Sequence, residues 1–263
     1  MKEQRSGARS RRAVLRAVPA VAAGAVTGCV AGSASGGEEP VSILAAGSLH
    51  LALAEGLAGA VEVPVQVEAH GSATVARLVD GGERDPDLVA VADAALFDSV
   101  LRPRWYATFA SNALVVAYDP DTRGGRRVAD GGPQGWYRPI QEGAATLGRT
   151  DPDHDPLGYR TLFMLELADR YYADAGELRE TVPPRAEVFP ERSLVSRLET
   201  GGIDTAVVYR NMAVQRGYDY VDLPAKIDLS EQRFADDWYR RAAYTLSDGV
   251  SVRGDVIRYG STA

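Results

Sequence analysis

The stretch VSILAAGSLHLALAEGLAGA, residues 41–60, changes its hydrophobic pattern at its middle. Residues 41–45 form a continuous apolar run of the kind that makes a buried strand, and Gly47 and Ser48 interrupt it. The leucines that follow recur at helical spacing, and serine favours the N-cap of a helix. The stretch therefore predicts a strand that enters a helix, with Ser48 as its N-cap, through a tight turn of small residues.

Two later stretches repeat this change from strand to helix. Residues 63–82, VPVQVEAHGSATVARLVDGG, predict a strand over Val63–Val67, a break at Gly71 and Ser72, and then a helix. Residues 87–101, DLVAVADAALFDSVL, again place an apolar run before a helical pattern. Strands that alternate with helices are typical of an α/β sheet with helical crossovers.

The second half of the chain predicts a further set of α/β elements. An apolar strand over Ala113–Tyr118 precedes a polar, glycine-rich segment, residues 121–140, where the chain is expected to enter a second lobe. A helix follows the acidic loop at residues 151–155, residues 190–209 predict a helix and a strand, and residues 218–224 predict another strand. These elements are enough for a second sheet with its own helices.

We therefore expect an α/β protein of two lobes with a ligand cleft between them. The first lobe is predicted to comprise residues 41–112 and 216–263, and the second lobe residues 113–215. At least two crossing strands should join the lobes. In open α/β sheets, ligands bind outside the carboxyl ends of the strands, so the strand-to-helix turns are the expected site.

The N-terminal residues 1–29 have the pattern of an export signal. Arg11 and Arg12 precede a short apolar stretch, and the Ser-Arg-Arg order resembles a twin-arginine signal. Val-Thr-Gly-Cys, ending at Cys29, resembles a lipobox, in which the cysteine becomes the lipid-modified first residue. Residues 30–40 are small and polar and are expected to form a flexible tether. We expect an exported protein, held by lipid at the outer face of the cytoplasmic membrane.

Composition and motifs exclude several functions. The net charge is −7 with scattered basic residues, which argues against a nucleic-acid surface. Cys29 is the only cysteine, so neither a disulfide within one chain nor a thiolate metal site is possible. No nucleophile motif, metalloprotease motif or phosphate-binding loop is present, so we expect no enzyme and no cofactor.

Four polar residues stand at or just before predicted helix starts: Ser48, Ser72, Asp155 and Glu191. Helix N-termini carry unpaired N–H groups and a partial positive charge, so several of them aimed at one cleft make an anion site. Each residue taken alone is also a common helix cap, and that alternative stays open for each.

The acidic loop GRTDPDHDPLGYR could instead bind calcium. Asp151, Asp153 and Asp155 match the first three ligand positions of a calcium loop. The sixth position, however, is Pro156 where glycine is needed, and the twelfth is Leu162 where an acid is needed. We therefore reject a calcium loop.

Seven segments together resemble the archaeal-type molybdate/tungstate-binding proteins of ABC transporters. They cover most of the chain from Val41 to Tyr259, and the most specific is Asp-Pro-x-x-Asp-Pro-x-Gly-Tyr-Arg, which begins at Asp151. The segments are AAGSLHLAL, VEAHGSATVARLVD, DLVAVADAALF, NALVVAYD, DPDHDPLGYRTLFMLELADRYY, PERSLVSRLETGGIDTAVVYRNMAVQRGYDYVDLP and IDLSEQRFADDWY. The resemblance implies a type II periplasmic-binding-protein fold that holds one tetraoxyanion in the cleft.

The resemblance also implies roles for individual residues. Ser48 and Ser72 would donate hydrogen bonds from the first lobe, and the second lobe would contribute Asp155, the backbone around Leu157, Glu191 and Tyr209. Asp155 and Glu191 would bond the Mo or W centre itself, which resolves why acids face a dianion. A tyrosine that ends an apolar strand is also often a core residue, and this reading of Tyr209 stays open.

The implied partners are molybdate or tungstate, an ABC permease with its ATPase, and the membrane through a lipid anchor, with the protein a monomer. Binding of sulfate or another oxyanion, or a sensor role without transport, are the alternatives. The chain departs from the pattern where it stops at VIRYGSTA, since relatives usually continue into a closing helix. A missing helix is expected to expose apolar sheet surface.

Overall fold

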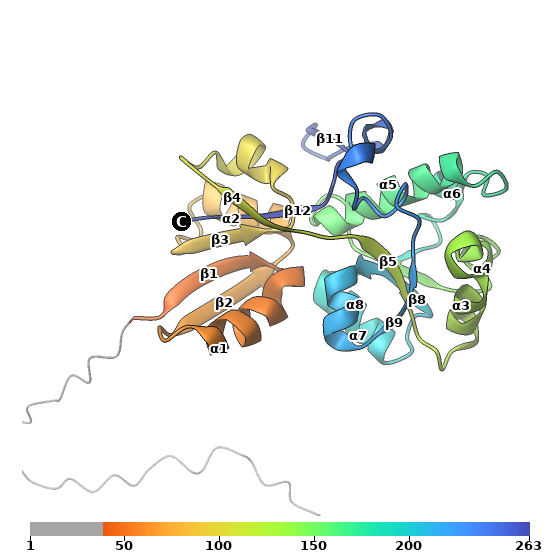
Figure 1. The fold of residues 1–263 in the computed structure, drawn as a ribbon, viewed down its shortest axis with the longest axis horizontal. Helices are drawn as coiled ribbons and strands as arrows, with labels where there is room; N and C mark the ends of the chain where they lie inside the picture. Colours follow the sequence, from red (N-terminus) through yellow and green to blue (C-terminus); the bar gives the residue numbers. More distant parts are fainter. Residues whose placement is uncertain (1–38) are drawn as a thin grey trace, which may run out of the picture. The chain divides into compact units, whose positions relative to one another are not determined.

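The computed structural model describes residues 39–263, and residues 38–263 form one compact unit. The predicted export signal, Cys29 and nearly all of the tether lie outside the described residues. Within them the chain forms two five-stranded sheets and a separate two-stranded hairpin (Figure 1). The expected α/β architecture is confirmed.

The first sheet carries the strand-to-helix turns of the N-terminal half. Its order is β2 (Val65–His70), β1 (Val41–Ala46), β3 (Leu88–Val91), β12 (Arg258–Thr262) and β4 (Ala107–Ser111). β1 lies parallel to β2 and β3, whereas β12 is antiparallel to both of its neighbours. Because Ala46 of β1 is opposite His70 of β2, the turns after these strands meet at one edge of the sheet.

The helical elements of this first lobe follow the predicted strands. They are η1 (Gly47–Leu49), a π-helical segment η2 (Ala52–Leu57), α1 (Ala58–Ala60), α2 (Ser72–Asp80) and a second π-helical segment, η3 (Phe97–Leu101). The prediction that Ser48 is an N-cap is wrong. Ser48 lies inside the first turn, the cap position belongs to Ala46, and no side chain caps this helix.

The second sheet repeats the plan of a parallel centre with antiparallel additions. Its order is β7 (Glu187–Val188), β6 (Leu147–Arg149), β8 (Thr205–Tyr209), β5 (Leu114–Tyr118) and β9 (Asp219–Asp222). The helices of this second lobe are α3 (Arg123–Gly135), α4 (Tyr137–Gln141), α5 (Pro156–Tyr171), α6 (Leu178–Thr181), α7 (Glu191–Glu199) and α8 (Arg210–Arg216).

Two details differ from the sequence-based expectation. The strand within residues 218–224 was assigned to the first lobe, but β9 pairs antiparallel with β5 and so belongs to the second sheet. The glycine-rich residues 121–140 do not form the crossing, because they fold into α3 and α4. The chain has already entered the second lobe at Asn112, between β4 and β5.

The outgoing and returning chain lie side by side between the lobes. Asn112 N donates to Ile257 O at 3.1 Å, and Leu114 N donates to Asp228 O at 2.9 Å. Ile257 N donates to Leu229 O at 3.0 Å, which joins the two parts of the returning chain. These backbone bonds form a narrow connection about which the lobes can rotate, as hinged binding proteins require.

The returning chain makes a small subdomain before it enters β12. It contains η4 (Gln232–Phe234), η5 (Tyr239–Arg241) and the antiparallel hairpin of β10 (Ala243–Thr245) and β11 (Ser251–Arg253). This subdomain packs against α5 (Figure 1). It therefore adds to the second lobe although its residues were predicted to lie in the first.

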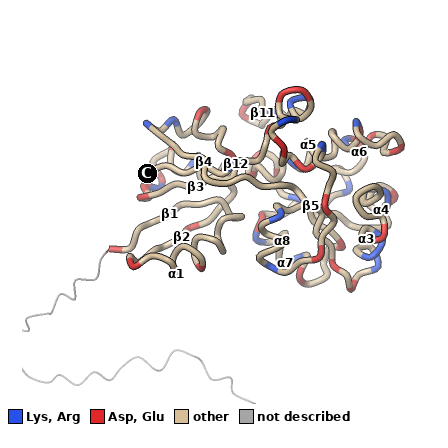
Figure 2. Tube along the Cα trace, viewed as in Figure 1, with Lys and Arg blue, Asp and Glu red and all other residues tan. Residues whose placement is uncertain are grey.

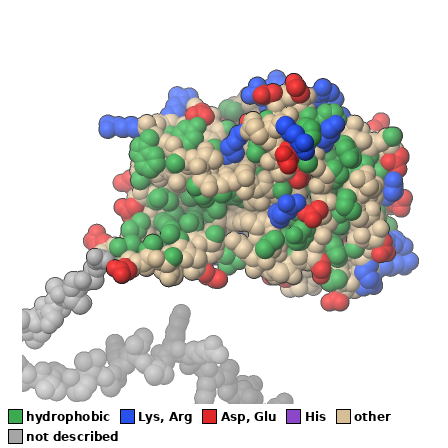
Figure 3. Space-filling model, in the orientation of Figure 1, with side chains coloured by type: hydrophobic (Ala, Val, Ile, Leu, Met, Phe, Trp, Pro, Cys, Tyr) green, Lys and Arg blue, Asp and Glu red, His purple; other side chains and the backbone are tan. Residues whose placement is uncertain are grey.

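Buried side chains of both lobes form one main hydrophobic core, and a smaller cluster around Leu44, Val75 and Phe97 lies between the first sheet and its helices. Acidic and basic residues are interspersed along both lobes (Figure 2). The first lobe exposes aromatic side chains at its edge strand, including Trp105 at 54% and Phe109 at 51%, and Figure 3 shows hydrophobic area over this lobe. Among residues 39–263, no helix combines the length and apolarity that a bilayer crossing needs.

Candidate oxyanion site

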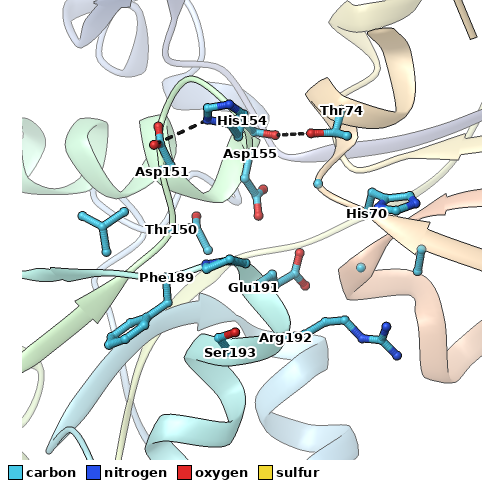
Figure 4. Close-up of a pocket in the computed structure, with 15 residues that line it drawn as sticks. His70, Thr74, Thr150, Asp151, His154, Asp155, Phe189, Glu191, Arg192 and Ser193 are labelled. Carbon is cyan, nitrogen blue, oxygen red and sulfur yellow. Dashed lines mark hydrogen bonds and ion pairs between the residues drawn. The ribbon is translucent and has the colours of Figure 1, made fainter. Parts of the chain in front are cut away.

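A cavity of about 610 Å³ opens between the two lobes. The first lobe lines it with Gly47 and with residues around the turn that follows β2. The second lobe lines it with the loop that follows β6 and with residues 188–193, where α7 begins. Figure 4 shows Asp155 and Glu191 pointing into the same space, with Thr150 beside them.

Several helix starts border the cavity, and of the four predicted helix-start residues Asp155 and Glu191 line it. Ser72 and Glu191 are the first residues of α2 and α7, and Asp155 is the N-cap of α5. Asp155 Oδ1 accepts a hydrogen bond from Leu157 N at 2.9 Å, so one carboxylate oxygen caps the helix. Ser48 borders a small adjoining cavity of about 40 Å³, which shares Gly47 and Glu191 with the large one.

Two glycines allow the lobes to touch. A side chain at Gly47 would place its Cβ 2.7 Å from Glu191 Oε2. A side chain at Gly71 would place its Cβ 2.7 Å from His154 O and 3.2 Å from Asp155 Cβ. Both distances are too short for carbon, so the close approach of the lobes depends on the absence of these side chains. The glycines that precede the two serines therefore allow the first-lobe turns to approach the second-lobe acids.

The carboxyl groups of Asp155 and Glu191 point into the same space (Figure 4). Asp155 is 6% exposed, and its Oδ2 has no hydrogen-bond partner among the described residues. Burial raises the pKa of Asp155, and burial together with the charge of Asp155 raises the pKa of Glu191 well above its usual range. The pair therefore favours holding at least one proton over two negative charges.

Three hydroxyl groups are positioned to act as donors. Ser72 Oγ accepts from Ala92 N at 2.9 Å, Ser48 Oγ accepts from Tyr259 Oη at 3.2 Å, and Tyr209 Oη accepts from Arg160 Nη1 at 2.7 Å. In each case a protein donor uses the oxygen, and the hydroxyl hydrogen is left to donate to an acceptor. Such a set suits the oxygen atoms of an anion.

The positions of Leu157 and Tyr209 in the structure refine the roles predicted for them. The backbone N–H of Leu157 is already used by Asp155, so Leu157 holds Oδ1 and thereby leaves Oδ2 for the cleft. Tyr209 is 1% exposed at the end of β8, and its ring meets the ring of Tyr259 with the centroids 6.0 Å apart. Tyr209 thus packs in the core and also presents a hydroxyl held by Arg160.

Several polar residues of the site were not predicted. Asn112 Nδ2 donates to Asn211 Oδ1 at 2.7 Å and to Tyr259 Oη at 2.8 Å. Asn211 Nδ2 in turn donates to Ser48 O at 2.8 Å. The asparagines and Tyr259 carry no motif, because they come from three distant segments: Asn112 from the link between β4 and β5, Asn211 from α8 and Tyr259 from β12. They fix the position of the Ser48 turn from the hinge side.

Two further residues could have been suspected from the acidic loop. Thr150 precedes it, is 1% exposed, and lines the cavity with an Oγ1 that has no partner among residues 39–263. Arg160 ends the distinctive Asp-Pro-x-x-Asp-Pro-x-Gly-Tyr-Arg segment and is 4% exposed. Arg160 stands in the segment that carries the strongest resemblance and Thr150 directly precedes it, and that place is the only signal for them.

The other two acids of the loop hold its shape. Asp151 Oδ1 accepts from Asp153 N at 2.9 Å, which closes a turn. Asp153 Oδ1 accepts from Ser247 N at 2.8 Å and from Tyr244 Oη at 3.4 Å, so it ties the loop to the chain around β10. The three acids thus have separate tasks, and Asp155 is the one whose free oxygen faces the cavity.

The acid pair predicts how stability depends on pH. Unfolded carboxyls titrate near about pH 4, and folding raises the pKa of both Asp155 and Glu191. Their contribution is therefore fully present below the unfolded pKa and is lost as the pH rises through the folded values. Glu191→Gln should flatten this dependence. Between pH 5 and 8 in oxyanion-free buffer, the melting temperatures of the wild type and the variant should converge at low pH, and the variant should melt at the higher temperature at high pH. Parallel curves would contradict the pairing.

Comparisons with known proteins agree with this geometry. A family described as bacterial extracellular solute-binding protein matches residues 41–240. A Haloferax volcanii protein named "Putative ABC transporter molybdenum-binding protein" is 52% identical over 259 residues, which are 98% of this chain and 83% of that protein. The molybdate/tungstate-binding protein of Thermococcus kodakarensis is 29% identical over 227 residues, covering 76% of this chain and 64% of the relative.

Among solved structures, the periplasmic molybdate-binding protein of Azotobacter vinelandii is similar in fold. The TM-score is 0.55 at 14% sequence identity, and the match covers 84% of each chain. This likeness supports the two-lobed binding-protein fold, which the resemblance had implied.

Proposed function

Because the chain belongs to the bacterial extracellular solute-binding protein family, we propose that it captures molybdate or tungstate between its lobes for an ABC importer. One observation carries the choice of ligand. The buried Asp155 Oδ2 has no hydrogen-bond partner among the described residues, and it faces a cavity that Glu191 and the buried hydroxyl of Thr150 also line. The names of the Haloferax and Thermococcus relatives support the same choice.

The acids and the donors divide the ligand between them. Ser48, Ser72 and Tyr209 donate hydrogen bonds to the oxo groups, and hydrogen bonds to charged acceptors are stronger than neutral ones. Asp155 and Glu191 offer carboxylate oxygens to the metal centre, since hard oxygen donors suit such a centre. Each lobe supplies only part of this shell, so capture of the ion and closure of the lobes occur together.

A site for sulfate is the second candidate, because hydroxyl donors at helix starts suit any tetraoxyanion. The acid pair disfavours it. A sulfur centre accepts no further ligands, so the carboxyls cannot bond it, and a carboxyl that is ionised repels the dianion.

Calorimetric titration of the purified protein with tungstate, molybdate, sulfate and phosphate tests this assignment. We expect one tungstate or molybdate ion per chain, bound at least about 100-fold more tightly than sulfate, a gap of about 2.7 kcal/mol. Equal affinity for sulfate would overturn the choice of ligand, and no binding of any oxyanion would overturn the function.

We further propose that Cys29 carries the lipid that holds the exported protein at the membrane. Two or more acyl chains anchor a protein stably, whereas a single chain does not. Cys29→Ser should therefore move the protein from the membrane fraction to the soluble fraction, and its tungstate affinity should stay within about twofold. Immunoblots of the two fractions check this expectation, and a variant that stays with the membrane would contradict it.

A further inference from the structure

We propose that Arg160 is a positioning residue that ties closure of the lobes to the alignment of two hydroxyl donors, Ser72 and Tyr209. This inference rests on the proposed oxyanion function and assigns the buried cation of Arg160 a task of its own. Arg160 lies on α5 of the second lobe, five residues after Asp155, and only 4% of it is exposed.

The guanidinium of Arg160 reaches both lobes. Nη1 donates to Ala92 O at 2.7 Å and to Tyr209 Oη at 2.7 Å, and Nη2 lies 3.3 Å from Asp93 Oδ2. Ala92 and Asp93 directly follow β3 of the first lobe, whereas Tyr209 ends β8 of the second. A single buried side chain therefore joins the ends of two strands that belong to different sheets.

The link to Ser72 runs through one residue. Ala92 O accepts from Arg160, and Ala92 N donates to Ser72 Oγ at 2.9 Å. The orientation of Ala92 therefore determines the position of the Ser72 hydroxyl and the direction in which its hydrogen can donate. On the other side, Arg160 occupies the oxygen of Tyr209 and so turns the Tyr209 hydrogen outward. Arg160 thus aligns one donor from each lobe.

Asp93 strengthens this connection. Asp93 forms an ion pair with Arg160 and also accepts a hydrogen bond from Tyr159 Oη. Two second-lobe side chains therefore hold one first-lobe carboxylate. Separation of the lobes would break these bonds and expose a cation and a carboxylate to water. When the lobes meet, the pair is largely desolvated and both partners have further hydrogen bonds, and removing one partner from such an arrangement is costly. The contact favours the closed arrangement in which both donors are aligned.

The fork shape of the guanidinium is essential to this role. Arginine presents several donors in a rigid plane, whereas lysine presents one compact ammonium at the end of a flexible chain. A lysine at this position would keep the charge but could not hold Ala92, Tyr209 and Asp93 together. Arg160→Lys therefore separates alignment from charge.

The test measures tungstate binding by the full-length protein with Arg160→Lys, and with Arg138→Lys as the matched control. Arg138 pairs with Asp174 at 2.7 Å on an exposed part of the second lobe. We expect Arg160→Lys to raise the Kd for tungstate about 10- to 100-fold, chiefly through faster dissociation, because the closed state loses its link. Arg138→Lys should change the Kd less than about twofold.

A double-mutant cycle with Tyr209→Phe separates positioning from general packing. If Arg160 acts through the Tyr209 hydroxyl, the double variant should bind no more than about threefold worse than the weaker single variant. A purely structural arginine would lower the melting temperature, and its effect on Kd would multiply with that of Tyr209→Phe. Multiplying effects, or an unchanged Kd in Arg160→Lys, would overturn the proposal.

If Arg160→Lys does not fold, the pair Ser72→Ala and Tyr209→Phe provides the cycle instead. The rise in tungstate Kd in the double variant should be smaller, by about threefold or more, than the product of the two single rises, because one guanidinium aligns both donors. Independent effects would overturn the inference. Failure of the wild type to bind tungstate or molybdate would overturn the proposed function and this inference together, which distinguishes that outcome from a failure of Arg160 alone.

Discussion

Asp155→Asn combined with Glu191→Gln is expected to remove the preference for tungstate and molybdate over sulfate. Each substitution keeps nearly the same shape but replaces a carboxylate oxygen by a weaker donor to a metal centre. Tungstate and molybdate affinity should therefore fall at least about 100-fold. Sulfate no longer meets the repulsion of an ionised carboxyl and should bind no worse than it binds the wild type. The preference for tungstate and molybdate over sulfate is therefore lost.

Competition titrations on the double variant measure this change, with Asp153→Asn as control. Asp153 belongs to the same loop, but its carboxylate holds Ser247 and Tyr244 and not the cavity. The control should keep the wild-type order of ligands. If Asp155 and Glu191 were only helix caps, the double variant would lose stability and keep its tungstate preference, which would refute coordination by these residues.

The second large effect is expected from Gly71→Ala. The backbone at Gly71 has φ −60° and ψ 140°, which alanine adopts without strain. Its Cβ would nevertheless stand 2.7 Å from His154 O and 3.2 Å from Asp155 Cβ in the other lobe. The lobes must then stay slightly apart, and small errors in the placement of binding groups are costly. We expect tungstate affinity to fall about tenfold or more with little change in melting temperature.

Gly59→Ala provides the control for Gly71→Ala. A Cβ at Gly59 would meet no atom within 4 Å, so the substitution adds the same methyl group away from the cleft. The two variants should therefore differ in tungstate affinity, measured by titration, and not in melting temperature. Equal affinities for both variants would show that the close approach at Gly71 is unimportant for binding.

The local elements were predictable from the sequence because they depend on neighbouring residues. Apolar runs broken by Gly-Ser predicted β1, β2 and the turns that follow them, and two of the four predicted helix-start residues, Asp155 and Glu191, line the large cavity. Asp155 was placed at a helix start, and the structure makes it the N-cap of α5, where Pro156 suits the first turn of the helix. Ser48 was misassigned as a cap because the helix begins at Gly47, which places the cap at Ala46, two residues earlier.

Contacts between distant segments could not be predicted in this way. β9 has four residues and no feature that selects one sheet over the other, so its pairing with β5 was missed. Tyr259 meets Ser48 only because the returning chain inserts β12 beside β3, at a separation of 211 residues. The bonds from Arg160 to Ala92 and Tyr209 likewise depend on how the lobes meet, which hydrophobic periodicity does not encode.

X-ray absorption at the Mo K edge of protein-bound molybdate tests the central claim most directly, because it reports the number of ligands around the metal. If Asp155 and Glu191 bond the centre, bound molybdate should lose the strong pre-edge peak of a tetrahedral ion and gain longer Mo–O distances from the carboxylates. The Asp155→Asn, Glu191→Gln double variant should leave any bound molybdate tetrahedral. A tetrahedral spectrum for molybdate bound to the wild-type protein would contradict the account.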